Sequence, residues 1–178
     1  MIRGKGTLRQ STSAYHWLGR GTYFWENDAQ RALEWAQRRP GKRALKVPFV
    51  IGAIIDMRNC LDLRARENVD LVRQAFELLE AETSGAGMEM PRNQEAPNDK
   101  SPDKVMRFLD CAVIDRLHEM VGEIGLEPFD TVRALFHEGD EIYKDSGFKD
   151  KTHSEIAVRN DDCILGYFIP RPAPVALP

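Results

Sequence analysis

The sequence predicts a single α+β domain with a mixed or mostly antiparallel sheet. Helical patterns lie in the first two thirds of the chain, strand patterns gather in the last third, and no repeating strand-helix-strand pattern is present. A length of 178 residues fits one domain, and a hydrophobic fraction of 42% is enough for a core. We assign residues 1–170 to this domain and the proline-rich residues 171–178 to a tail.

Charge and cysteine usage exclude several classes of protein. Lys and Arg number 25 against 28 Asp and Glu, a balance that does not fit nucleic-acid binding through a basic footprint. Cys60, Cys111 and Cys163 are odd in number and widely spaced, so they predict no disulfide framework and favour the cytoplasm. The longest apolar stretch, residues 47–55, is shorter than the roughly 20 residues of a membrane span, and we expect no membrane anchor.

The first forty residues predict a loop, a short strand and a helix, in that order. Glycines mixed with Ser, Thr and Arg indicate irregular backbone over residues 1–22, and residues 22–24 form the short strand. Asn27 and Asp28 offer a helix cap. Apolar residues at positions i, i+3, i+4 and i+7 then predict a helix over about residues 28–39.

The middle of the chain predicts one strand and two helices. Residues 46–56 are β-branched and continuously apolar, which is typical of a strand buried on both faces at the centre of a sheet. Residues 70–83 and 102–123 show helical periodicity. Between them, residues 84–101 are small, polar and interrupted by proline, so we expect a mobile surface loop.

The last third predicts short segments. Residues 130–139 form a short element, and residues 139–148 are rich in turn formers. Residues 154–160 and 163–170 then predict two strands separated by a pair of aspartates.

Residues 17–36 contain the first candidate site. Gly19 and Gly21 permit a flat ligand to approach the backbone closely, and Tyr23 and Trp35 supply aromatic faces. The alternative is that these aromatic side chains pack in the core and that the Gly-x-Gly pair is coincidental. Composition alone favours the alternative.

Glu155 is the second candidate, at the start of a predicted strand. A carboxylate in this position is either a solvated charge or an acid placed to stabilise positive charge in a cleft. His118 and His137 lack the spacing of metal ligands, and we expect no metal site.

Together these motifs resemble the ADP-ribosyltransferase superfamily, in the branch of poly-ADP-ribose polymerases and diphtheria toxin that a His, Tyr, Glu triad marks. Residues 19–24, Gly-Arg-Gly-Thr-Tyr-Phe, resemble the Gly-x-Gly-x-Tyr-Phe strand of that branch. Residues 155–158 resemble the strand that opens with the catalytic Glu, and residues 163–167 resemble the strand paired after it. Residues 50–139 are also similar to a bacterial, toxin-like branch, so the resemblance covers most of the chain.

The resemblance implies a split, mixed β-sheet with flanking helices that binds NAD, as substrate, between two sheet halves. Gly19 and Gly21 would lie near NAD, and Tyr23 and Trp35 would enclose the nicotinamide. Glu155 would bind a ribose hydroxyl and stabilise the positive charge that forms as nicotinamide leaves. ADP-ribose would pass to a macromolecular acceptor or to water, and a toxin-like member implies an antitoxin or immunity protein as partner.

The sequence departs from the family at the triad's His. No His-Gly pair is present, and His16 is too close to Tyr23 for that role, so we interpret it as a loop residue. Either the His strand is missing from this chain, or the chain does not bind NAD in the usual way. Without that strand we expect the sheet to have an exposed edge. His153 matches an acceptor-facing position of related arginine-modifying transferases, but we favour a role in capping its strand. The alternative function is an inactive transferase-like module that acts through a protein partner.

Overall fold

The computed structural model describes residues 8–37, 47–96 and 103–171. They form three α-helices, a four-stranded sheet and a two-stranded sheet. The elements follow in the order β1 (Thr22–Trp25), α1 (Ala29–Gln37), β2 (Gly52–Ile55), β3 (Cys60–Asp62), α2 (Arg66–Gly85), α3 (Phe108–Glu123), β4 (Thr131–Phe136), β5 (His153–Val158) and β6 (Ile164–Phe168). The predicted α+β class is confirmed.

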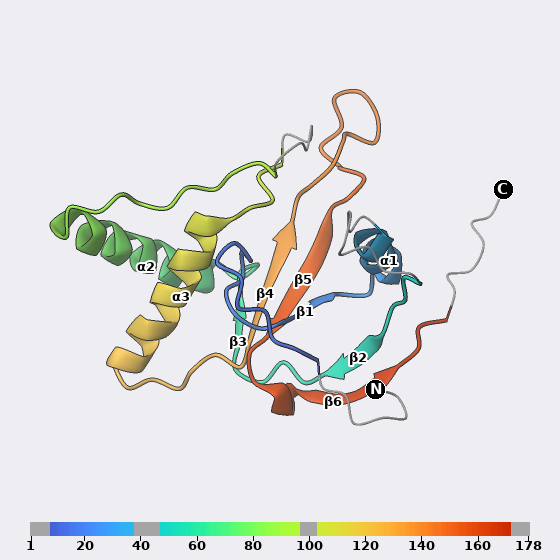
Figure 1. The fold of residues 1–178 in the computed structure, drawn as a ribbon, viewed down its shortest axis with the longest axis horizontal. Coiled ribbons are helices and arrows are strands. Elements are labelled where there is room, and N and C mark those ends of the chain that lie inside the picture. The colour runs from blue at the N-terminus through green and yellow to red at the C-terminus, as the bar shows by residue number, and fades with distance from the viewer. Residues whose placement is uncertain (1–7, 38–46, 97–102, 172–178) are drawn as a thin grey trace.

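The four-stranded sheet has the order β1-β5-β4-β3 and is mixed. β5 pairs with β1 and β4 in antiparallel fashion, whereas β3 lies parallel to β4. A parallel pair needs a long crossover, and α2 and α3 provide it. These two helices lie on one side of the sheet, while α1 and the β2–β6 sheet lie on the other side (Figure 1).

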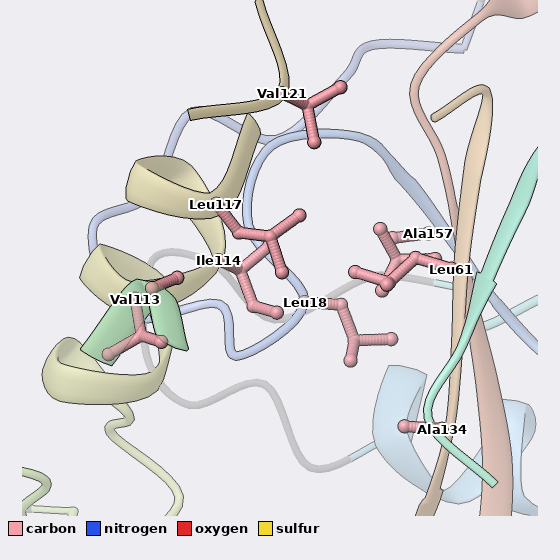
Figure 2. Packing of buried hydrophobic residues seen from close by; sticks show 10 residues of the cluster. Leu18, Leu61, Val113, Ile114, Leu117, Val121, Ala134 and Ala157 are labelled. Carbon is pink, nitrogen blue, oxygen red and sulfur yellow. The ribbon is translucent and has the colours of Figure 1, made fainter. Parts of the chain in front are cut away.

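The main core lies between α3 and one face of the four-stranded sheet (Figure 2). Ile114 and Leu117 on α3 are three residues apart and share one face of that helix. They pack with Leu18, from the loop before β1, and with Ala157 of β5; Leu18, Leu117 and Ala157 are fully buried. Burial of these aliphatic groups holds the helical layer on the sheet.

Polar contacts fix the two crossover helices. Arg116 of α3 is 8% exposed and donates hydrogen bonds to Glu82 of α2 and to Glu123. Asn93 accepts hydrogen bonds from the backbone amides of Leu109 and Asp110 and thereby caps the start of α3. Part of the segment predicted as a mobile loop therefore makes fixed contacts, and its residues 97–101 lie outside the described residues.

A smaller core joins the two sheets. Val158 and Cys163 are fully buried and pack with Ile156 and Ile55 on the sheet face opposite the main core. The prediction that Cys163 is a core residue, which its position beside aromatic residues suggested, is confirmed.

The strand predicted over residues 46–56 was assigned to the wrong place in the fold. The strand β2 covers only Gly52–Ile55 and belongs to the two-stranded sheet, where Ile54 is 58% exposed. It is therefore not central and not buried on both faces, and Lys46 lies outside the described residues. β6, which was expected to pair after the Glu155 strand, pairs instead with β2.

The other boundaries differ in smaller ways. Asp28 caps α1, because its carboxylate accepts a hydrogen bond from the backbone amide of Arg31 at 2.8 Å. α2 is longer than residues 70–83. α3 begins at Phe108 and not at residue 102, because described residues 103–107 are not helical.

Candidate functional site

Tyr23 and Glu155 lie on the same face of adjacent strands. The register of β1 and β5 places Tyr23 opposite Ala157 and Trp25 opposite Glu155. Because side chains alternate along a strand, all four point to one side of the sheet, and Tyr23 and Glu155 are diagonal neighbours. Two residues that are 132 positions apart are thus brought together, as the paired motifs required.

Two donors hold the carboxylate of Glu155. The indole Nε1 of Trp17 donates to Oε2 at 2.6 Å, and Nε2 of His153 lies 3.3 Å from Oε1. The Glu155 side chain is only 14% exposed. The strand-end charge is therefore not a solvated one, and it is held among partners.

Aromatic rings surround this carboxylate. Phe136 lies 5.3 Å from the His153 ring and 4.8 Å from the Trp17 ring, centroid to centroid. The guanidinium of Arg107 lies over Phe136 at 4.6 Å. On the other side, Trp25 lies 6.4 Å from His153. The local dielectric constant around Glu155 is consequently low, which strengthens its electrostatic interactions.

Tyr23 is held by the loop that precedes it. Its hydroxyl donates to the carbonyl of Gly19 at 2.7 Å and accepts from the amide of Leu18 at 3.0 Å. Burial raises the pKa of Tyr23 well above its usual value, and the negative charge of Glu155 adds to this, so the phenol stays neutral. Its ring edge meets His16, with 5.0 Å between ring centroids. Tyr23 can therefore act through its ring and not as an acid or base.

A cleft of about 760 Å³ runs along β1, between α1 and the segment leading into β2. Its volume is in the range of small-molecule sites. Tyr23, Trp25 and Trp35 belong to its lining, together with Phe49. Trp35 is 43% exposed and its ring lies 6.0 Å from that of Trp25. Glu155 is not part of the lining: the cleft lies on the sheet face of Phe24, Ile55 and Ile156, opposite the face to which the side chains of Tyr23 and Glu155 point.

Gly19 and Gly21 contact the protein itself. Gly19 has a φ of +76°, a conformation that favours glycine, and a Cβ there would lie 3.0 Å from Ile114. A Cβ on Gly21 would lie 2.8 Å from the carbonyl oxygen of Val158 on β5. Neither glycine belongs to the cleft lining, and contact between these glycines and NAD stays a prediction.

Sequence reasoning missed the partners of Glu155. Trp17 stood within the first cluster, but nothing in the sequence linked it to a carboxylate 138 residues away. His16 is a loop residue, as predicted, yet it packs on Tyr23. Arg107 and Phe136 carried no signal, because they reach the site through the crossover and the register of β4.

No group of three His, Cys, Asp or Glu side chains within the described residues is placed to hold a metal ion. No helix in the same part of the chain is long and apolar enough to cross a membrane. Comparisons with protein-family models, with curated proteins and with solved structures find no match to this chain.

Proposed function

We propose that this protein is an NAD-consuming ADP-ribosyltransferase with an ADP-ribosyltransferase-like split sheet. The observation that carries the proposal is the juxtaposition of Tyr23 and Glu155 on one sheet face. A cleft lined by Trp25 and Trp35 lies along β1 on the opposite face. The division of the strands into two sheets that enclose this cleft also supports it.

The proposed chemistry assigns a role to each side chain. Nicotinamide enters the cleft along β1, where the face of Trp35 restricts its orientation, and the Tyr23 ring supports β1 from the opposite face. Glu155 accepts a hydrogen bond from the adjacent ribose and stabilises oxocarbenium character as the bond between ribose and nicotinamide breaks. An acceptor nucleophile, on a macromolecule or from water, then takes the ADP-ribosyl group.

Nicotinamide release from NAD tests this function directly. Glu155→Gln keeps the size of the side chain and removes its charge, so we expect the rate to fall by about a hundred- to a thousandfold. Glu77→Gln, at an exposed position on α2, is the matched control and should keep the parental rate. A Glu155→Gln rate within about twofold of the parent would show that the assigned role is wrong, since one lost electrostatic group has a larger effect.

One observation favours the second candidate function, a binding module without catalysis. The carboxylate of Glu155 is occupied by Trp17 and His153 and is not part of the cleft lining. Under this alternative, calorimetric titration with NAD shows no heat of binding while a stable protein partner is recovered. Tight NAD binding with nicotinamide release contradicts it.

A further inference from the structure

His153 and Trp17 contact the two oxygens of the Glu155 carboxylate, one side chain on each oxygen. The side chain of His153 is 3% exposed, and it lies between a backbone carbonyl and a carboxylate: Nδ1 is 2.6 Å from the oxygen of Lys151, and Nε2 is 3.3 Å from Oε1 of Glu155. Trp17 approaches the other carboxylate oxygen from the loop before β1. The proposed function above uses Glu155 but assigns nothing to these partners.

The acceptors around His153 determine its protonation. A carbonyl oxygen only accepts hydrogen bonds, so Nδ1 must carry a proton. Nε2 must also carry a proton if Glu155 is ionised, because a carboxylate only accepts. The indole N–H of Trp17 can only donate, so it matches a carboxylate oxygen that accepts.

We propose that His153 and Trp17 are positioning residues that hold the Glu155 carboxylate in one orientation, His153 as an imidazolium and Trp17 as a neutral donor. Each carboxylate oxygen has two acceptor sites, so one remains on each oxygen for a ribose hydroxyl. The effect on rate rests on the proposed function, whereas the charge state of His153 does not.

The groups around His153 shift its pKa in opposite directions. Burial by itself lowers the pKa of His153, but the hydrogen bonds to Glu155 and to the Lys151 carbonyl raise it above its usual value. Arg31 on α1 lowers it again, and the charge of Arg31 is balanced by Glu138 at 2.7 Å. Just before α3, Arg107 lies over the Phe136 ring, whose centroid is 5.3 Å from that of His153.

The sign of the pH dependence follows from this raised value. Because the folded-state pKa of His153 lies above the unfolded value of about 6.5, its stabilising ion pair is fully present below that pH. The pair is lost as the pH rises through the folded-state pKa. Orientation of Glu155 then depends on Trp17 alone.

Nuclear magnetic resonance titration of the histidine rings tests the proposal on the whole chain, without any substrate. In the parent protein we expect His153 to titrate above about 6.5 and to carry protons on both ring nitrogens at pH 6. In Glu155→Gln the pKa of His153 should fall below the parental value, because burial and Arg31 still lower it and only the hydrogen bond to the Lys151 carbonyl still raises it. His137→Gln, at an exposed site, should leave it unchanged. A ring that is singly protonated at pH 6, or a pKa that does not respond to Glu155→Gln, would overturn the proposal.

Kinetics with NAD separate this proposal from the proposed function. Trp17→Phe keeps an aromatic ring and removes the donor, and it should lower kcat about 10- to 100-fold with KM for NAD changed less than about twofold. In the parent, kcat should fall as the pH rises through the His153 pKa measured by magnetic resonance. If the parent releases no nicotinamide, the proposed function fails, and the titration still decides the charge of His153. If Trp17→Phe raises KM and leaves kcat unchanged, Trp17 binds substrate and its positioning role is wrong.

Discussion

One face of the four-stranded sheet holds two environments only two residues apart on β5. The side chains of Ala157 and Glu155 point the same way, but Ala157 meets aliphatic groups whereas Glu155 meets hydrogen-bond donors and aromatic rings. We define the aliphatic end as Leu18, Ile114, Leu117 and Ala157, and the polar end as Trp17, Trp25, His153 and Glu155.

The difference indicates which end stabilises the fold. Burying aliphatic surface is favourable without any partner, whereas a buried charge is tolerated only when other groups compensate its lost hydration. The polar end places a carboxylate where an aliphatic side chain could have extended the core. Residues that lower stability in this way are typical of functional sites, so the aliphatic end should govern unfolding and the polar end should govern ligand chemistry.

The largest effect on stability is expected at the aliphatic end. Leu117 is fully buried between α3 and the sheet, and Leu117→Ala should lower the free energy of unfolding by about 2–5 kcal/mol through lost burial and a residual cavity. Urea unfolding measures this. Leu126→Ala, at a side chain that is 60% exposed, should change stability by less than about 0.5 kcal/mol. If both substitutions changed the free energy of unfolding by the same amount, the aliphatic end would not be the part that stabilises the fold.

The next largest effect is expected from His118 on α3, which should make the free energy of unfolding depend on pH. Its ring packs against Phe129, and neither ring nitrogen has a hydrogen-bond partner in the described part of the chain. Burial lowers the pKa of His118 to about 3. Below about pH 6.5 the unfolded chain therefore binds a proton that the native state does not, and stability should fall by up to about 1.4 kcal/mol per pH unit.

Urea unfolding of His118→Leu at pH 7 and pH 5 checks this sign. The variant should lose less stability on acidification than the parent, and His153, present in both, cancels from the difference. His137→Leu, at an exposed position, should keep the parental pH dependence. A His118→Leu variant as acid-sensitive as the parent contradicts the expectation.

Gly19 lies where the two ends of the face meet. Its carbonyl accepts the hydroxyl of Tyr23, and its φ of +76° favours glycine. Gly19→Ala should cost about 1–2 kcal/mol of stability, since a left-handed conformation is strained for alanine and the Cβ would crowd Ile114. Gly122→Ala, in the last turn of α3 with no atoms within 4 Å of the added Cβ, should instead stabilise by up to about 0.5–1 kcal/mol. Thermal unfolding distinguishes these opposite signs.

Local signals allowed much of the fold to be predicted. The Asp28 cap, the α2 periodicity and the strand around Tyr23 depend on residues close in the sequence, and the structure contains all three. β2 was misplaced because a short apolar run has the same pattern whether it lies at the centre of a large sheet or in a small one. β3 was missed because it is only three residues long.

The candidate site was predictable only in part, because several of its contacts join residues that are far apart in the sequence. Tyr23 and Glu155 were identified through family motifs, and antiparallel pairing of their strands brings them to one face. The contacts of Glu155 with Trp17 and of Phe136 with His153 depend on loop conformation and on the pairing of β4 with β5. Such long-range contacts leave no periodic signal in a single sequence.

Trp35, on α1 and outside both ends, gives the smallest expected effect on stability and tests the cleft along β1. Its ring is 43% exposed, so Trp35→Ala should change the free energy of unfolding by less than about 0.5 kcal/mol. As a wall of the cleft, however, it should contribute stacking to NAD, and its loss should weaken NAD binding about tenfold in a calorimetric titration. Tyr143→Ala removes a ring that is 59% exposed outside the cleft, and it should change neither quantity. If Trp35→Ala binds NAD as tightly as the parent, the cleft along β1 is not where nicotinamide stacks, and Glu155 acts without that wall or not at all.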